Sequence, residues 1–293
     1  MSASYSNDTL NKYMGIYTET DGVSVYCASD TDENLYFVNF TQSWFSFGKI
    51  KDKKYTGKVC KLVNNSYDIP KDRRYEIGMH ELTMGADGVF DGVFIAGESV
   101  FLVTLTLKQS INLPEKPILD EINGNDCIQT KGGTRAVYIF KNFVVKQLEP
   151  GIGFVEIIKN LLAIDHNLPV VKCMGMIKLT KSKIGDCHFD NYNQQFNSFY
   201  LVEEKAEPID WYRSIYNFDI YRENKTMWDN FTNSLQESGL AGDFNLGNIL
   251  KLGDKFVATD LNTTSIDWLL SRGMISSWDA AMDFTVRLSD YCA

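Results

Sequence analysis

The sequence predicts an α+β fold in two parts, and three observations support this prediction. Short β-branched and aromatic runs separated by Asp, Gly and Asn turns fill most of 1–111, which is typical of an antiparallel β-rich domain. Two prolines among charged residues mark 112–122 as a linker. In 123–293, strand-like runs are joined to amphipathic helical ones, which indicates a domain of mixed sheet and helix.

The strands of the N-terminal domain are predicted where apolar runs stop at turn residues, at 22–27, 35–40, 44–47, 57–63 and 100–107. The segment 86–94 contains two Asp-Gly pairs, which tight hairpin turns would explain, and a calcium loop is the alternative. We expect this domain to recruit a target or to regulate the domain that follows it.

The second domain begins with predicted strands around a lysine and a pair of glycines. Apolar runs between 127 and 148 are strand-like, and Gly132 and Gly133 lie in a turn between the first two of them. Lys146 lies inside the third apolar run, so its ammonium group needs a counter-charge or a ligand. A glycine turn lets the backbone come close to phosphate groups.

A loop and a hairpin near the C-terminal end carry Asp243, Asn248 and Asp260. Two short strands with a Gly-Asp turn follow Asn248, so Asp260 is expected to emerge close to it. Carboxylate and amide oxygens suit Mg²⁺, and a tight loop can hold Asp243 beside a hydroxyl that attacks a phosphate. The alternative is a helix, a loop and a surface hairpin whose polar residues only cap and turn.

Taken in order, the glycine turn, the strand lysine and the Asp/Asn/Asp set resemble the protein kinase-like superfamily over about 123–262. The resemblance implies a compact bilobal kinase-like domain that binds ATP and Mg²⁺. It assigns Gly132 and Gly133 to the glycine-rich loop over the nucleotide, and it assigns Lys146 to the α- and β-phosphates.

The resemblance also implies roles for the acidic and amide residues. Asp243 corresponds to the catalytic base, and Asn248 and Asp260 correspond to the residues that bind Mg²⁺. The family pattern includes a helical glutamate that pairs with the strand lysine. Glu156 lies on the amphipathic helix that follows that lysine, so the resemblance assigns it this role.

Two further segments resemble family elements. The run 198–205 is similar to the fifth strand and the hinge, where the backbone around Glu203 and Lys205 would meet adenine. The run 228–238 is similar to the helix that supports the catalytic loop. An ordinary core strand and an ordinary core helix explain these two segments equally well.

The departures from the family pattern indicate a reduced kinase. Ala241 and Gly242 replace the His-Arg that usually precedes the catalytic aspartate, so control by activation-loop phosphorylation is not expected. Asn245 stands where Ser/Thr kinases usually carry a lysine. About thirty residues follow Asp260, which implies a truncated C-lobe without room for a small-molecule substrate. The layout is most similar to minimal bacteriophage early protein kinases and bacterial effector kinases, and it favours a protein substrate.

Composition narrows the classes of partner and compartment. A net charge of −9 argues against direct nucleic-acid or anionic-membrane binding and fits protein partners with basic surfaces, host proteins among them. No apolar run is long enough to cross a membrane, and six scattered cysteines indicate reduced thiols. We therefore expect a cytoplasmic protein, in the host cytoplasm if a phage encodes it.

Three functions remain open at this point. The resemblance predicts an ATP-dependent kinase that transfers the γ-phosphate to Ser/Thr of proteins. The alternative is a catalytically weak kinase-like binding protein that captures and inhibits a partner through its N-terminal β domain. A third hypothesis keeps the nucleotide but transfers AMP or another group in place of phosphoryl.

Overall fold

The computed structural model of the chain describes the N-terminal part almost throughout and selected segments after it. The described residues are 11–30, 34–42, 44–61, 76–111, 121, 128–131, 136–148, 153–179, 183–184, 187–188, 198–209, 225–238 and 248–261. Three predicted site residues, Gly132, Gly133 and Asp243, lie outside the described residues, as does most of the predicted linker.

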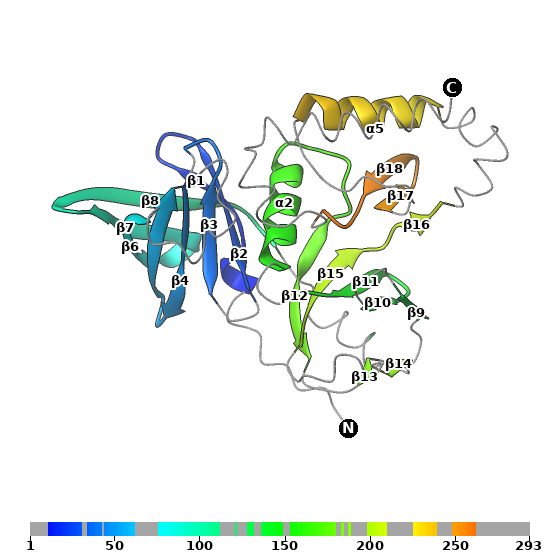
Figure 1. The fold of residues 1–293 in the computed structure, drawn as a ribbon, viewed down its shortest axis with the longest axis horizontal. Helices are drawn as coiled ribbons and strands as arrows, with labels where there is room; N and C mark the ends of the chain where they lie inside the picture. The colour runs from blue at the N-terminus through cyan, green and yellow to red at the C-terminus, as the bar shows by residue number, and fades with distance from the viewer. Residues whose placement is uncertain are drawn as a thin grey trace.

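Eight antiparallel strands form a closed barrel in the N-terminal part (Figure 1). Each strand pairs with the next one along the chain, and the last strand closes the barrel by pairing with the first. Tight turns join several of these strands, which favours pairing between sequence neighbours. The strands are β1 (Gly15–Glu19), β2 (Ser24–Ser29), β3 (Leu35–Asn39), β4 (Trp44–Lys51), β5 (Lys54–Lys61), β6 (Glu76–Met84), β7 (Val89–Ala96) and β8 (Ser99–Ser110).

Aromatic side chains from different strands pack together as one core of the barrel. The ring of Phe37 on β3 makes edge-to-face contacts with Tyr55 on β5 and Phe90 on β7, with centroids 4.9 and 5.3 Å apart. Tyr17 on β1 joins the same buried cluster. An eight-stranded barrel is just wide enough for side chains to fill its interior. Burial of each large apolar side chain stabilises the fold by about 2–3 kcal/mol.

The two Asp-Gly pairs have different structural roles. Asp87 and Gly88 have positive φ angles of 62° and 77° in a short turn before β7. Asp91 and Gly92 lie within β7, so the second predicted hairpin turn is wrong. A Cβ at Gly92 would lie 1.9 Å from the carbonyl oxygen of Glu81 on β6. Glycine is therefore needed there because two strands approach closely.

A five-stranded antiparallel sheet follows the barrel in the order β12-β15-β11-β10-β9. Helix α2 (Gly153–Asp165) comes after the central strand of this sheet and before its edge strand β12. The strands are β9 (Ile128–Lys131), β10 (Ala136–Ile139), β11 (Phe143–Gln147), β12 (Cys173–Leu179) and β15 (Ser198–Glu204).

Helix α2 lies between the barrel and the five-stranded sheet (Figure 1). On the barrel side, Tyr36 stacks on Phe154 with ring centroids 3.7 Å apart. The Tyr26 hydroxyl donates to Asp165 over 3.1 Å, and Lys108 forms an ion pair with Asp165 over 2.6 Å. One cluster of buried apolar side chains includes residues of the barrel, the helix and the sheet. The helix is thus held from both sides.

The remaining described elements are short. Strands β16 (Glu207–Pro208), β17 (Ile249–Leu252) and β18 (Lys255–Ala258) form a three-stranded sheet, and helix α5 (Lys225–Ser238) lies near it in Figure 1. Strands β13 (Lys183–Ile184) and β14 (Cys187–His188) form a small hairpin.

The predicted α+β fold with a bilobal kinase-like domain and a truncated C-lobe is wrong. The described residues are mostly antiparallel β-structure, with a closed eight-stranded barrel and only two α-helices in the described part of the chain. The prediction extended the architecture of a family from a few loop residues to the whole domain. The apolar runs themselves are short and bounded by turn residues, which favours strands over helices.

Candidate functional site

Lys146 is the centre of the candidate site. It lies on β11, the central strand of the five-stranded sheet, opposite Leu201 of β15 and Val137 of β10. The lysine is only 7% exposed. A buried ammonium group is costly unless charged or hydrogen-bonding partners surround it.

Three side chains from three different elements contact the Lys146 ammonium group. Its Nζ atom lies 3.3 Å from Glu156 Oε1 on α2 and 3.0 Å from Glu203 Oε2 on β15. It also donates to the Thr259 hydroxyl, just after β18, over 2.7 Å. That hydroxyl in turn donates to Glu203 Oε2 over 3.3 Å. The family resemblance assigns Glu156 as the partner of Lys146, and in the structure the two side chains form an ion pair.

The carboxylates keep Lys146 protonated. Burial alone would lower the pKa of this lysine, but the nearby charges of Glu203, Glu156 and Asp260 outweigh burial and raise it. Burial raises the pKa of Glu203 and the charges of Glu156 and Asp260 raise it further, whereas the Lys146 ammonium group lowers it. Three acidic side chains thus lie around two lysines, Lys146 and Lys159, and this excess of acidic groups would attract a cation.

The β17–β18 hairpin brings the two predicted metal ligands to this cluster. The amide of Thr259 donates to the carbonyl oxygen of Asn248 over 2.9 Å, which places Asn248 beside the residue that precedes Asp260. Asp260 has a positive φ of 55°, a conformation that few non-glycine residues adopt. Its charge acts on both Lys146 and Lys159.

Asn248 and Asp260 carry oxygen donors of the kind that Mg²⁺ prefers. In the part of the chain that the structure describes, no three His, Cys, Asp or Glu side chains form a group that could hold a metal ion. Asn248 and Asp260 can offer one amide oxygen and one carboxylate, and the backbone contact between Asn248 and Thr259 keeps the two residues near each other. Mg²⁺ usually takes only one or two carboxylates from a protein and completes its shell with water and phosphate oxygens.

A second buried lysine lies beside the same carboxylates. Lys159 is one turn after Glu156 on α2 and is fully buried. Among the residues that the structure describes, its Nζ atom has no hydrogen-bond partner. Burial lowers its pKa to about 7, although the charges of Glu156 and Asp260 oppose that change. At neutral pH this amine can therefore exist with or without a proton.

The two residues assigned to adenine binding have other contacts in the structure. The Glu203 side chain faces Lys146, and the Lys205 ammonium group donates to the carbonyl oxygens of Phe140 and Lys141 over 2.9 and 3.4 Å. Lys205 thereby joins the end of β15 to the turn between β10 and β11. The backbone role predicted for these residues stays a prediction.

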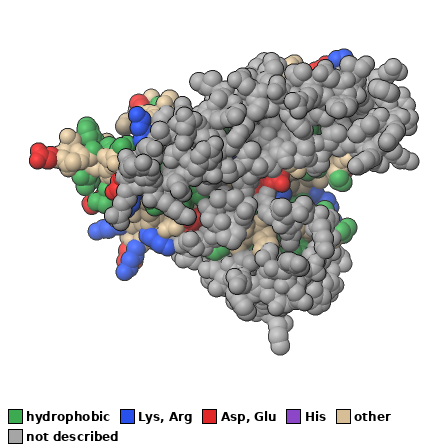
Figure 2. All heavy atoms as spheres, viewed as in Figure 1, with side chains coloured by type: hydrophobic (Ala, Val, Ile, Leu, Met, Phe, Trp, Pro, Cys, Tyr) green, Lys and Arg blue, Asp and Glu red, His purple; other side chains and the backbone are tan. Residues whose placement is uncertain are grey.

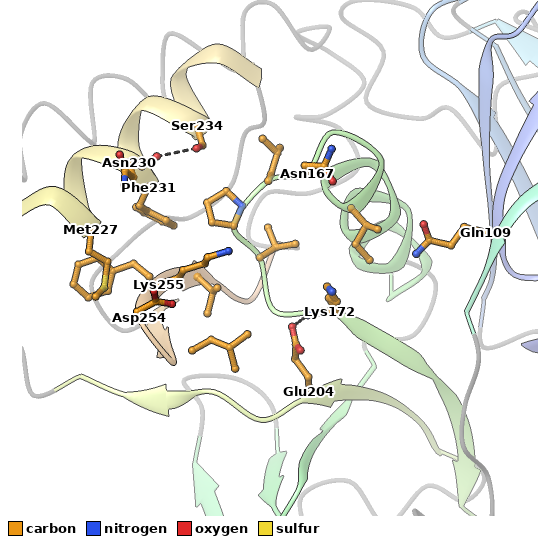
Figure 3. A pocket seen from close by; sticks show the side chains of 17 residues that line it. Gln109, Asn167, Lys172, Glu204, Met227, Asn230, Phe231, Ser234, Asp254 and Lys255 are labelled. Carbon is orange, nitrogen blue, oxygen red and sulfur yellow. Dashed lines mark hydrogen bonds between the residues drawn. The ribbon is translucent and has the colours of Figure 1, made fainter. Parts of the chain in front are cut away.

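An open pocket of about 620 Å³ lies on another side of the same elements (Figure 3). Glu204 and Lys172 line it, and the Glu204 carboxylate accepts a hydrogen bond from the Lys172 amide over 2.8 Å. Successive residues of a strand point to opposite faces. Glu203 therefore belongs to the lysine cluster, whereas its neighbour Glu204 belongs to this separate pocket.

Three side chains of the cluster are not predicted from the sequence. The family resemblance gives Glu203 only a backbone role, and it gives Thr259 and Lys159 no role. A signal for Lys159 was present, because it interrupts the apolar run from Phe154 to Leu162 as Glu156 does. Thr259 and Glu203 carry no comparable signal, since their positions depend on how distant strands pair.

We compared the chain with models of known protein families and with curated proteins, and neither comparison gave a match. Among the described residues, no helix is both long enough and apolar enough to span a membrane.

Proposed function

We propose that this protein binds ATP with Mg²⁺ and transfers the γ-phosphate to Ser/Thr hydroxyls of other proteins. The observation that supports this function best is the Lys146–Glu156 ion pair, buried where the β17–β18 hairpin delivers Asp260. The proposal concerns the chemistry of this cluster and does not depend on a bilobal fold.

Four described residues of the cluster have a role in this proposal. Lys146 would bind the α- and β-phosphates, and Glu156 would hold its ammonium group in place. Asn248 and Asp260 would hold Mg²⁺, which when bound would neutralise charge on the phosphates. Asp243, outside the described residues, would accept the proton of the attacking hydroxyl.

The charge balance of the cluster predicts that nucleotide binding needs the metal. Glu156, Glu203 and Asp260 surround Lys146 with carboxylates, so an unaccompanied triphosphate would meet net negative charge. The Glu203 Oε2 atom lies 3.0 Å from Lys146 Nζ. A phosphate group would have to displace this carboxylate before it could contact the lysine. A bound divalent cation would reduce both costs.

The test is label transfer from ATP by the full chain. Purified protein is incubated with Mg²⁺, a cell extract and either γ-labelled or α-labelled ATP. We expect transfer from the γ-position only, reduced at least about 100-fold in Asp243→Ala and Lys146→Met. Lys61→Met removes an exposed lysine of β5 and should transfer normally.

Two results would overturn this proposal. Transfer from α-labelled ATP would indicate nucleotidyl transfer, and equal transfer by wild type and Lys146→Met would exclude the cluster. Thermal unfolding of each variant shows whether a loss of transfer reflects a loss of folding.

The binding alternative is supported by a different observation. Large apolar side chains are exposed on the β7–β8 hairpin, at Val100, Phe101 and Leu102. Exposed apolar patches often mark sites of protein interaction. In this alternative the chain captures a partner through its N-terminal β part and has little or no turnover.

A further inference from the structure

The β7–β8 hairpin extends beyond the barrel wall (Figure 1). Strand β8 pairs with β1 only from Leu105 to Ser110, whereas it pairs with β7 from Ser99 to Thr106. Among the strands that the structure describes, none pairs with the outer edge of 99–104. Within the described part of the chain this segment of β8 is therefore an open sheet edge, which we call the β8 edge.

The β8 edge lacks the features that usually protect such edges. Val100, Phe101 and Leu102 are 63%, 53% and 90% exposed, and Ile77 at the start of β6 is 43% exposed. The segment 99–104 contains no charged residue and no proline. Natural sheets use lysine, proline or bulges to prevent unwanted pairing at exposed edges. The β8 edge is open to pairing with an added strand.

The register of the hairpin shows which backbone groups are available. The two-residue loop between Ala96 and Ser99 makes these two residues the first pair of the hairpin. In an antiparallel pair, alternate residues direct their N–H and C=O groups away from the partner strand. This alternation directs the backbone groups of Val100, Leu102 and Thr104 outward, toward the open side.

Charge indicates the chemistry of the partner. The strands β6 to β8 and their turns contain one lysine, Lys108, which is paired with Asp165. The acidic residues in the same range are Glu76, which is paired with Lys58, and Glu81, Asp87, Asp91 and Glu98. Figure 2 shows apolar and acidic side chains at the end of the molecule where the hairpin projects. Two copies joined at this edge would bring like charges together, so a basic partner is favoured.

We propose that the β8 edge binds an extended segment of another protein, with apolar residues at alternate positions and Lys or Arg on both sides, as an added β-strand. Main-chain hydrogen bonds to an open edge supply affinity in this mode of recognition, and alternate side chains supply specificity. This proposal rests on the alternative function, in which the chain captures a partner, and it states what kind of partner that is. It does not depend on phosphotransfer.

The test uses a synthetic peptide with the sequence Lys-Lys-Val-Thr-Val-Thr-Val-Lys-Lys and the full chain. We expect binding, measured by fluorescence anisotropy, at least about 10-fold tighter than for the same core flanked by glutamates at low salt. Added salt should reduce this ratio. Hydrogen exchange should show slower exchange of the amides of Val100, Leu102 and Thr104 when the peptide is bound.

Substitutions of one residue separate the backbone contribution from the side-chain contribution. Leu102→Pro removes an outward N–H group, which an edge strand tolerates, and should weaken peptide binding at least about 10-fold. Leu102→Thr keeps the N–H group and should weaken binding less. Leu102→Lys keeps the backbone and should repel the lysine-flanked peptide, so it tests the proposal if the proline variant fails to fold.

Several outcomes would overturn the proposal. Two of them concern the peptide: equal binding of both peptides, and no protection of the β8-edge amides from hydrogen exchange. The other two are self-association that Leu102→Lys abolishes, and Leu102-dependent binding to neutral phosphatidylcholine vesicles. Self-association would make a second copy the occupant, and vesicle binding would make it a membrane. The quantity measured is peptide binding, so a loss of phosphotransfer in any of these variants would neither support nor overturn the proposal for the β8 edge.

Discussion

Replacing Lys159 by methionine should stabilise the protein. Lys159 is fully buried on α2, and its Nζ atom has no hydrogen-bond partner among the described residues. Burial lowers its pKa from the usual 10.5 to about 7, so at neutral pH the folded protein holds this proton only in part, whereas the unfolded chain would keep it. Methionine has a similar length and no charge to desolvate.

The size of the gain follows from the change in pKa. A fall from 10.5 to about 7 corresponds to an unfavourable free energy on the order of 4 kcal/mol at pH 7. Above pH 10.5 both states of wild type carry a neutral amine, so this contribution disappears. The contribution of Lys159 to the wild-type free energy of unfolding should therefore rise between pH 7 and 10.5, because the unfolded lysine keeps its proton there while the buried one does not. Lys159→Met should lack that rise.

The assay is urea unfolding followed by tryptophan fluorescence at several pH values between 7 and 10. Lys159→Met should exceed wild type most at pH 7, and the difference should shrink as the pH increases. The control Lys61→Met removes an exposed lysine and should change the free energy of unfolding by less than about 0.5 kcal/mol.

A destabilised Lys159→Met protein would refute this reasoning. It would mean that the attraction of the Lys159 ammonium group to Glu156 and Asp260 exceeds the cost of burying it. A stability gain that stays constant from pH 7 to 10 would also refute it, because the gain would then not come from protonation.

Three further predictions test other parts of the molecule. Glu156→Gln should lower kcat/KM for phosphotransfer by roughly 10- to 100-fold, because Lys146 would no longer be held in position. An unchanged kcat/KM would exclude the Lys146–Glu156 pair from the site. Burial lowers the pKa of His80 from 6.5 to about 4, so stability should fall as the pH drops through this window. Unfolding of His80→Leu should depend less on pH there, and an equal dependence would assign the effect to other groups. Gly92→Ala should destabilise the barrel by roughly 2–3 kcal/mol in urea unfolding, because its Cβ would meet the Glu81 carbonyl oxygen at 1.9 Å. Gly85→Ala, whose Cβ would meet nothing closer than 3.5 Å, should be nearly neutral, and equal losses would contradict the steric explanation.

Local parts of the structure could be predicted from the sequence because their signals are local. Lys146 stands out as a charge inside an apolar strand, and Glu156 lies on the first amphipathic helix after it. The ion pair between them joins two elements that are adjacent in the chain. The hairpin that brings Asp260 near Asn248 is also local, since a Gly-Asp turn joins its strands.

The rest depended on contacts between distant residues. Closure of the barrel requires Gly15 to pair with Ser110, and alternating apolar residues fit an open sheet equally well. Whether Glu203 or Glu204 faces Lys146 depends on the register between β11 and β15, and a shift of one residue would exchange them. The helical lobe was expected from a family pattern, and the apolar runs of this chain did not require it.

Contact between the barrel and α2 ties the Lys146–Glu156 pair to the N-terminal part. Phe154, two residues before Glu156, stacks on Tyr36 of β3, and Asp165 at the other end of the helix bonds to Tyr26 and Lys108. An outward movement of α2 that separates Glu156 from Lys146 would also break the contacts between the helix and the barrel. The N-terminal part thus acts as a brace for the helix, and a chain without it would have to hold Glu156 in place by the sheet alone.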